Sequence, residues 1–237
     1  MFTPREIRRA IEALPLGERE AILEWLAERS YIEAPANSVG DGEMAYGVAP
    51  PRSLTVDEYF ELEERSVLCH EYINGAVYPR MGASLAHNLI TLELATLLSQ
   101  HLHDGPCRVF SINLKLHLKL GEDQIFYYPD VMVACDRQGW GEHFIHNPKL
   151  VVEVLSPITE ATDLREKVLN YKRLASVEEY VIAAQADPRV TIYRRAEGWE
   201  PRIYAGYDTR LELRSVGLTV PLSVVYREAL SEGNFRP

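Results

Sequence analysis

The 237-residue sequence is poor in cysteine and has no long apolar run. Its three cysteines, Cys69, Cys107 and Cys135, form no CxxC pair, and we expect them to be reduced thiols of an intracellular protein. No apolar stretch reaches the roughly 18–20 residues that cross a bilayer. Residues 1–5 begin a polar helix and not a signal peptide. Together these absences predict a soluble, cytoplasmic protein.

Several motifs that carry chemistry are also missing. The sequence contains no Walker loop, GxGxxG, GxSxG or HExxH motif. Two histidine pairs, His101-x-His103 near Cys107 and His143-x-x-His146, are weak zinc candidates. The spacing of the first pair turns its two histidines to different helix faces. The candidate chemistry therefore depends on carboxylates and lysine.

Net positive charge is absent as well, because 25 Lys and Arg stand against 35 Asp and Glu. A net charge of −10 argues against nucleic-acid binding, which depends on basic side chains. The acidic excess lies mainly in residues 1–64, with a net charge of −8, whereas residues 65–237 carry only −2. Residues 165–195 contain seven basic and four acidic side chains. A solvated helix face and a DNA contact both explain this local excess.

Composition divides the chain into two predicted parts, residues 1–50 and residues 51–237. In the first part, a capping box with proline at the first helical position opens a helix that ends near residue 13. A second amphipathic helix is predicted over residues 18–28, followed by a linker rich in Pro and Gly. The helical hairpin within residues 1–35 could dock a protein partner, mediate dimerisation or pack on the main domain.

The main domain begins with a short helix and a hairpin. A capping box at residues 55–58 opens the helix, and Asn74-Gly75 predicts the two-residue turn of a hairpin over residues 70–78. Apolar residues at intervals of three and four then predict a long amphipathic helix over residues 84–103. Its apolar face is predicted to comprise Leu85, Leu89, Leu92, Ala95 and Leu98.

Strand patterns dominate the rest of the chain. They are interrupted by one further helix, predicted over residues 159–175. Strands followed by a helix and more strands predict an α/β fold with a mixed central β-sheet flanked by helices. The predicted strands are residues 107–119, which are broken or bent, and residues 131–135, 149–155, 179–184, 189–194 and 201–204.

Two acids occupy unusual places in these strands. Glu153 interrupts the apolar run of residues 150–155, which predicts a strand buried on both faces. A lone carboxylate there costs several kcal/mol unless it is ion-paired or binds a metal. Asp130 follows Pro129 at the start of the preceding strand. The two acids could converge on one Mg²⁺, and the alternative for Glu153 is an ion pair with an arginine.

A lysine follows the second acid on a predicted helix. Asp163, Lys167 and Tyr171 are separated by four residues each, which places them on one helix face. A surface ion pair of Asp163 with Lys167 is the simpler interpretation. Because this helix directly follows the Glu153 strand, Lys167 could instead reach back over the strand end. Its ammonium could then orient an attacking water or neutralise charge on a phosphate.

Glu71 and His87 are further candidates with ordinary alternatives. Glu71 lies on a strand of the predicted hairpin, where a plain exposed acid would also be expected. His87 lies early in the long helix, where a core or surface histidine would also be expected. Neither residue defines a site without the others.

Taken together, these residues resemble the Uma-two family of restriction endonucleases, which have a PD-(D/E)XK nuclease fold and occur in cyanobacteria and other bacteria. Nucleases of the wider superfamily usually carry a lysine two residues after the second acid, where this chain has Leu155. The resemblance covers roughly residues 53–225. It is carried by His70-Glu71-Tyr72-Ile73-Asn74-Gly75, His87, Pro129-Asp130, Val152-Glu153-Val154-Leu155-Ser156-Pro157, Thr159, Asp163, Lys167, Tyr171 and Glu179-Tyr180.

The resemblance implies a restriction-endonuclease-like domain with a metal site. Asp130 and Glu153 would be metal ligands, and Glu71 would be a further acidic ligand. Lys167 would be the displaced catalytic lysine, and His87 would line the site. These roles predict an endonuclease that uses Mg²⁺ or Mn²⁺ to hydrolyse DNA phosphodiester bonds, with a homodimer suited to cutting both strands. Two alternatives stay open: a catalytically silent nuclease fold that acts as an interaction or regulatory module, and a nuclease activated only by a partner.

Overall fold

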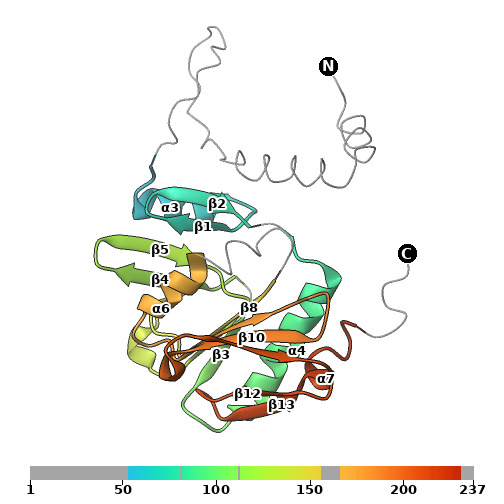
Figure 1. Cartoon of the computed structure of the whole chain (residues 1–237). Coiled ribbons are helices and arrows are strands. Elements are labelled where there is room, and N and C mark those ends of the chain that lie inside the picture. Colours follow the sequence, from blue (N-terminus) through green and yellow to red (C-terminus); the bar gives the residue numbers. More distant parts are fainter. Residues whose placement is uncertain (1–52, 81, 112, 156–165, 231–237) are drawn as a thin grey trace, which may run out of the picture. The chain divides into compact units, whose positions relative to one another are not determined.

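The computed structural model describes residues 53–80, 82–111, 113–155 and 166–230 (Figure 1). The predicted helical hairpin, the linker and the boundary near residue 51 lie outside these ranges. Among the described residues, no helix combines the length and apolarity needed to cross a membrane. The chain divides into two compact units: one runs to His70 and includes Gly75–Pro79, and the other comprises Glu71–Asn74 and the chain from Arg80 onward.

The first unit contains helix α3 (Val56–Arg65). The predicted capping box opens it: the Thr55 hydroxyl accepts from the Glu58 amide, and the Glu58 carboxylate accepts from the Thr55 amide at 2.9 Å. Tyr59 is fully buried in this helix. Its hydroxyl donates to the backbone carbonyl of His70 at 2.7 Å, which ties the helix to the chain that follows.

Asn74 and Gly75 separate strand β1 (His70–Ile73) from strand β2 (Ala76–Pro79). Both residues have positive φ, 50° for Asn74 and 98° for Gly75. A type I′ turn requires positive φ at both central positions, which asparagine tolerates and glycine adopts freely. The predicted two-residue turn is therefore confirmed.

In the second unit, a smaller sheet has the strand order β1-β5-β4-β7. Strand β1 runs antiparallel to β5 (Asp123–Tyr127), with Tyr72 opposite Phe126. Strand β4 (Lys115–Leu120) is antiparallel to β5 and parallel to β7 (Phe144–Ile145). In this sheet Glu71 lies on β1, and the aromatic residues Phe126 and Tyr127 lie on the neighbouring strand β5.

The larger sheet of the second unit has the strand order β11-β10-β9-β8-β6-β3. Strands β8 and β9 are parallel, and the other neighbouring pairs are antiparallel, so the sheet is mixed, as predicted. All five residues of β8 are buried, in agreement with its apolar run. The strands are β3 (Arg108–Ser111), β6 (Val131–Ala134), β8 (Leu150–Val154), β9 (Glu179–Ala183), β10 (Arg189–Arg194) and β11 (Pro201–Ala205).

Helix α4 (Leu85–His101) packs against β3, β6 and β8 of this sheet (Figure 1). The predicted helix is confirmed, but its predicted apolar face is partly wrong. Leu85 and Leu92 are each 58% exposed, whereas Ile90 and Leu94 are buried together with Leu98. Apolar residues surround much of this helix, so their spacing alone does not select the buried face.

The remaining elements are short. The segment predicted as a broken or bent strand over residues 107–119 consists of β3 and β4, as expected, and strands β5, β7, β12 and β13 were not predicted. Of the helix predicted over residues 159–175, the structure describes residues 166–173 as helical. The short elements are α6 (Val168–Arg173), β12 (Arg210–Leu213), β13 (Leu218–Pro221), α7 (Leu222–Val225) and the 3₁₀ turns Arg137–Gly139 and Arg195–Glu197.

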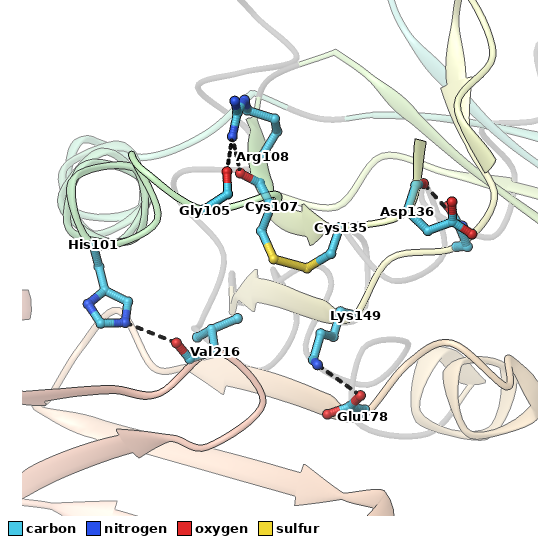
Figure 2. The surroundings of a disulfide bond; sticks show 10 residues. His101, Gly105, Cys107, Arg108, Cys135, Asp136, Lys149, Glu178 and Val216 are labelled. Atoms are coloured by element: carbon cyan, nitrogen blue, oxygen red, sulfur yellow. Dashed lines mark hydrogen bonds and ion pairs between the residues drawn. A yellow bond between two sulfur atoms is a disulfide. The ribbon is translucent and has the colours of Figure 1, made fainter. Parts of the chain in front are cut away.

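Cys107 and Cys135 form a disulfide (Figure 2), which corrects the prediction of reduced thiols. The antiparallel register pairs Arg108 of β3 with Ala134 of β6, so the two cysteines follow as the next opposed pair. Their Cα atoms are 3.8 Å apart, although 28 residues separate them in sequence. Such a pairing across strands leaves no spacing signal in the sequence. These cysteines therefore give no support to an intracellular location, and Cys69 is the free thiol.

Candidate active site

Asp130 and Glu153 stand opposite each other on neighbouring antiparallel strands. Strand β6 begins at Val131, which pairs with Val152 of β8. Extending this register by one pair places Asp130 opposite Glu153. Opposed side chains project from the same face of a sheet, with Cβ atoms roughly 4.5–5.5 Å apart. Both residues are buried, at 7% and 3% exposure, so the strand pairing brings two carboxylates together in the protein interior.

Three groups surround the carboxylate of Asp130. Its Oδ2 accepts the backbone N–H of Val154 at 2.7 Å and lies 3.1 Å from Nε2 of His87. Its Oδ1 lies 3.5 Å from Nη2 of Arg80. His87 belongs to the first turn of α4, where the Ser84 hydroxyl caps the helix by accepting the His87 amide at 3.1 Å. The capped helix therefore holds His87 beside Asp130.

Lys167 connects Glu153 to Glu71. Its Nζ lies 3.1 Å from Oε1 of Glu153 and 3.1 Å from Oε1 of Glu71, and its side chain is 6% exposed. One turn later, the Tyr171 hydroxyl donates to the same Glu153 oxygen at 3.1 Å. The four-residue spacing thus places Lys167 and Tyr171 on the helix face that looks back at β8. Asp163, the third residue of that spacing, lies outside the described residues.

These contacts decide several of the alternatives left open by the sequence. Glu153 is ion-paired with Lys167. Lys167 is buried and contacts Glu153, so its side chain reaches back over the strand end and does not lie on the surface, whereas Asp163, its partner in the alternative, lies outside the described residues. Glu71 is 15% exposed and ion-paired, so it is not a plain exposed strand acid. His87 contacts Asp130 and is 13% exposed.

Sequence reasoning missed a tyrosine beside Lys167. The Lys167 Nζ lies 5.3 Å from the ring centroid of Tyr127, on β5. The Tyr127 hydroxyl donates to Glu166 Oε1 at 2.5 Å and accepts from the Asn170 amide at 2.7 Å. Burial and the hydrogen bond to Glu166 raise the pKa of Tyr127, so this hydroxyl stays protonated at neutral pH. The available signal was the run Phe126-Tyr127-Tyr128, which marks a strand too aromatic to be a loop.

The local excess of basic residues over 165–195 serves the fold to a large extent. Arg194 is 2% exposed, and its Nε donates to Oε1 of Glu179 at 2.7 Å. The Nε of Arg195 donates to the backbone carbonyl of Val177 at 2.9 Å. Lys167 is buried as well, so neither Lys167 nor Arg194 contributes to an exposed basic surface.

The carboxylates fit a magnesium-type cation better than a closed zinc site. Within the described ranges, no group of three or more His, Cys, Asp or Glu side chains is arranged to hold a metal ion. Mg²⁺ binds through only one or two carboxylates, with water and substrate phosphate oxygens as its other ligands. Asp130 and Glu153 provide such a pair. Asp130, Glu153 and Glu71 provide three carboxylates. Two cationic side chains, Lys167 and Arg80, contact them, which leaves an excess of one negative charge among these five groups.

The mixed sheet and the buried acids with their lysine define a restriction-endonuclease-like α/β protein. The chain belongs to the Uma-two (Uma2) family, whose model, described as "Putative restriction endonuclease", matches residues 56–224. This match confirms the resemblance drawn from the motifs. It covers every residue of the candidate site.

Relatives and a solved structure agree with this assignment. The uncharacterized protein slr1290 of Synechocystis is 36% identical over 182 residues, which cover 76% of this chain and 94% of that protein. A second uncharacterized Synechocystis protein, sll1609, is 31% identical over 151 residues, or 62% of this chain and 84% of that protein. A crystal structure from Anabaena variabilis, described as "a putative nuclease belonging to DUF820", has a TM-score of 0.60 at 19% identity. It covers 75% of this chain and 99% of its own. At this identity the likeness supports the fold.

Proposed function

We propose that this chain is a Mg²⁺-dependent endonuclease that hydrolyses phosphodiester bonds in DNA. The observation that carries the proposal is the contact of 3.1 Å between Lys167 Nζ and Glu153 Oε1. The position two residues after Glu153 holds Leu155 and cannot supply an ammonium. Lys167, at the N-cap of helix α6, supplies one instead and completes a set of two acids and a lysine. The family description supports nuclease chemistry, and the choice of DNA extends it.

Asp130 and Glu153 would hold the cation, and Glu71 would hold the ammonium of Lys167 beside them. When bound, the cation would supply Lewis-acid stabilisation of the negative charge that develops on the phosphate. Mn²⁺ could replace Mg²⁺, because carboxylate oxygens suit both ions. The burial of Asp130 and Glu153 limits competition from bulk water for their carboxylates.

The other site residues act on these carboxylates or on the substrate. The ammonium of Lys167 can orient an attacking water or stabilise charge on a phosphate oxygen. Burial and the charge of Glu153 raise the pKa of Tyr171, so its hydroxyl stays protonated and donates to Glu153. His87 holds the carboxylate of Asp130 through a contact of 3.1 Å between Nε2 and Oδ2.

The test is cleavage of supercoiled plasmid by the purified full chain with Mg²⁺ or Mn²⁺. Wild type should nick the plasmid, and Asp130→Asn and Lys167→Ala should lower the rate by roughly 10²–10⁴-fold, the range for a positioned catalytic group. Lys149→Ala is the matched control, because Lys149 forms a surface ion pair with Glu178 at 3.1 Å (Figure 2). Equal residual cleavage by wild type and both site variants would identify a contaminant and reject the proposal. A parallel assay with single-stranded RNA decides the nucleic-acid class.

The silent-module alternative draws support from the internal ion pairs of the site. Lys167 contacts Glu71 and Glu153, and Arg80 and His87 contact Asp130, so the acids are largely neutralised by the protein itself. Calorimetry distinguishes the two functions. Mn²⁺ binding that is lost in an Asp130→Asn variant supports the nuclease, and no Mn²⁺ binding to wild type supports the interaction module.

A further inference from the structure

Arg80 is a basic residue beside the acidic pair to which neither the motifs nor the fold assign a role. Its Nη2 lies 3.5 Å from Oδ1 of Asp130, and its side chain is 30% exposed, whereas that of Asp130 is 7% exposed. A partly exposed ion pair at this distance contributes little to stability. The contact with Asp130 therefore does not make Arg80 important for the stability of the fold.

The two oxygens of Asp130 have different surroundings. Oδ2 accepts the Val154 N–H at 2.7 Å and faces His87 Nε2 at 3.1 Å. Two donors match the two lone pairs of a carboxylate oxygen. A cation bound by Asp130 would therefore use Oδ1, which is the oxygen that Arg80 faces. Arg80 and a divalent cation would repel each other there, because both are positive and the surroundings are partly buried.

A second interaction keeps Arg80 close to the site when it leaves Asp130. The guanidinium carbon lies 5.3 Å from the ring centroid of Tyr128, and Nζ of Lys115 lies 5.2 Å from the same ring. Guanidinium groups stack on aromatic rings while their N–H groups remain able to donate, and they bind phosphate oxygens in a bidentate manner. Tyr128 thus gathers two cations near the acids that would hold the metal.

We propose that Arg80 binds a backbone phosphate of the substrate, and that it moves from Asp130 to this phosphate when a divalent cation occupies the acidic pair. Tyr128 supports the guanidinium in both positions, and Lys115 adds positive charge beside it. The ligand class is a phosphodiester of a nucleic acid. This inference rests on the proposed function and extends it, because it couples metal binding to substrate binding through one side chain.

The exchange predicts opposite effects of one substitution. Arg80→Ala should raise the affinity for Mn²⁺ roughly two- to fivefold, because it removes a cation that competes for Oδ1. The same variant should bind duplex DNA about tenfold more weakly. The dependence of its log affinity on log salt concentration should be shallower, by the amount expected for the loss of about one phosphate contact. Arg80→Lys should keep the charge and recover only part of the duplex affinity, because an ammonium cannot donate as a planar fork.

The experiment measures both affinities on the full chain. Calorimetry with Mn²⁺ and no DNA gives the first, and fluorescence anisotropy of a labelled duplex, with and without Ca²⁺, gives the second. Ca²⁺ serves as a hard cation that prefers the same oxygen ligands. In wild type, Ca²⁺ should raise duplex affinity more than in Arg80→Ala, because binding couplings are reciprocal. Arg202→Ala, on the exposed strand β11, removes one positive charge elsewhere and should match wild type.

The outcomes separate this inference from the function on which it rests. Weaker Mn²⁺ binding by Arg80→Ala, or duplex affinity equal to that of Arg202→Ala, would overturn the role of Arg80. Wild-type protein that binds no divalent cation would overturn the metal-dependent function and the exchange together. In that case a duplex-affinity loss confined to Arg80→Ala would still support the phosphate contact.

Discussion

The Nζ of Lys167 lies 3.1 Å from Oε1 of Glu153, and both side chains are at most 6% exposed. The same ammonium lies 3.1 Å from Glu71. Buried carboxylates are stable only when a cation or hydrogen-bond donors compensate their charge. Lys167 therefore has a structural role in addition to the catalytic role proposed for it, and the two roles can be measured separately.

Replacing Lys167 by methionine should destabilise the protein strongly. The substitution leaves Glu153 and Glu71 without the cation that both contact, and loss of one partner of a buried pair costs about 3–5 kcal/mol. The matched control Lys149→Met breaks a surface pair with Glu178 and should cost about 0–1 kcal/mol. Urea unfolding followed by circular dichroism measures both.

A second variant tests the cause of that loss. Adding Glu153→Gln to Lys167→Met removes one of the two charges and should recover part of the lost free energy of unfolding. Equal stability of Lys167→Met and Lys149→Met would show that Lys167 is not held in a buried pair.

The disulfide between Cys107 and Cys135 should contribute measurably to stability. It closes a loop of 28 residues, for which chain-entropy arguments give roughly 3–4 kcal/mol. Cys135→Ala should lower the free energy of unfolding by about this amount in oxidising buffer and should have little effect with reductant present. Cys69→Ala is the matched control, because Cys69 is outside the disulfide. Thiol titration of the unfolded protein should find one free thiol, and a count of three would contradict the prediction.

His117 should make stability depend on pH. It is 9% exposed and stacks on Phe126 with ring centroids 4.1 Å apart. Burial, opposed by the hydrogen bond to Gln124, lowers the pKa of His117 from its ordinary 6.5. The unfolded chain then binds the proton at higher pH than the folded chain. The contribution of neutral His117 is therefore present above about pH 6.5 and is lost as the pH falls through the lower folded-state pKa.

The slope of unfolding free energy against pH checks this assignment. Between about pH 7.5 and 5.0, His117→Gln should lose less stability than wild type, by at most about 1.4 kcal/mol per pH unit. His143→Gln replaces an exposed histidine and should follow wild type. Wild type and His117→Gln with the same slope would exclude His117 as the titrating group.

Local sequence patterns predicted much of the candidate site because the periodicity of single strands and helices fixes where these residues lie. A continuous apolar run places Glu153 in a buried central strand, and a spacing of four residues places Lys167 and Tyr171 on one helix face. Both relationships depend on short stretches of chain. The structure adds the register between β6 and β8, which sets Asp130 opposite Glu153.

The parts that sequence reasoning missed depend on contacts between distant segments. Arg80 and Asp130 are in contact although they are 50 positions apart in sequence, and Tyr127 contacts Glu166 from a strand that was not predicted. The aromatic run that contains Tyr127 favours a strand, but it does not indicate which distant residue the Tyr127 hydroxyl contacts. The buried face of α4 depends on which sheet it covers, and its own composition does not specify that.

Leu155 occupies the position at which nucleases of the wider superfamily usually carry the lysine. Transferring the lysine from position 167 to position 155 tests whether the two positions are equivalent. The backbone N–H of Leu155 donates to the carbonyl of Ala183 at 2.8 Å, so the strand pairing continues past the end of β8. Residues two apart on a strand share a face, which puts Leu155 on the side of Glu153. Its side chain packs against the core cluster that includes Val168 and Tyr171.

Lys167→Leu should therefore lower plasmid nicking by roughly 10²–10⁴-fold, and adding Leu155→Lys should recover at least about tenfold of that loss. The double variant should also be more stable than Lys167→Leu, because an ammonium again compensates Glu153. Nicking rates and urea midpoints of the two variants measure both effects. A double variant that regains stability but no activity would show that Glu153 needs only a counter-charge, and that catalysis requires the ammonium at the position of Lys167, between Glu153 and Glu71.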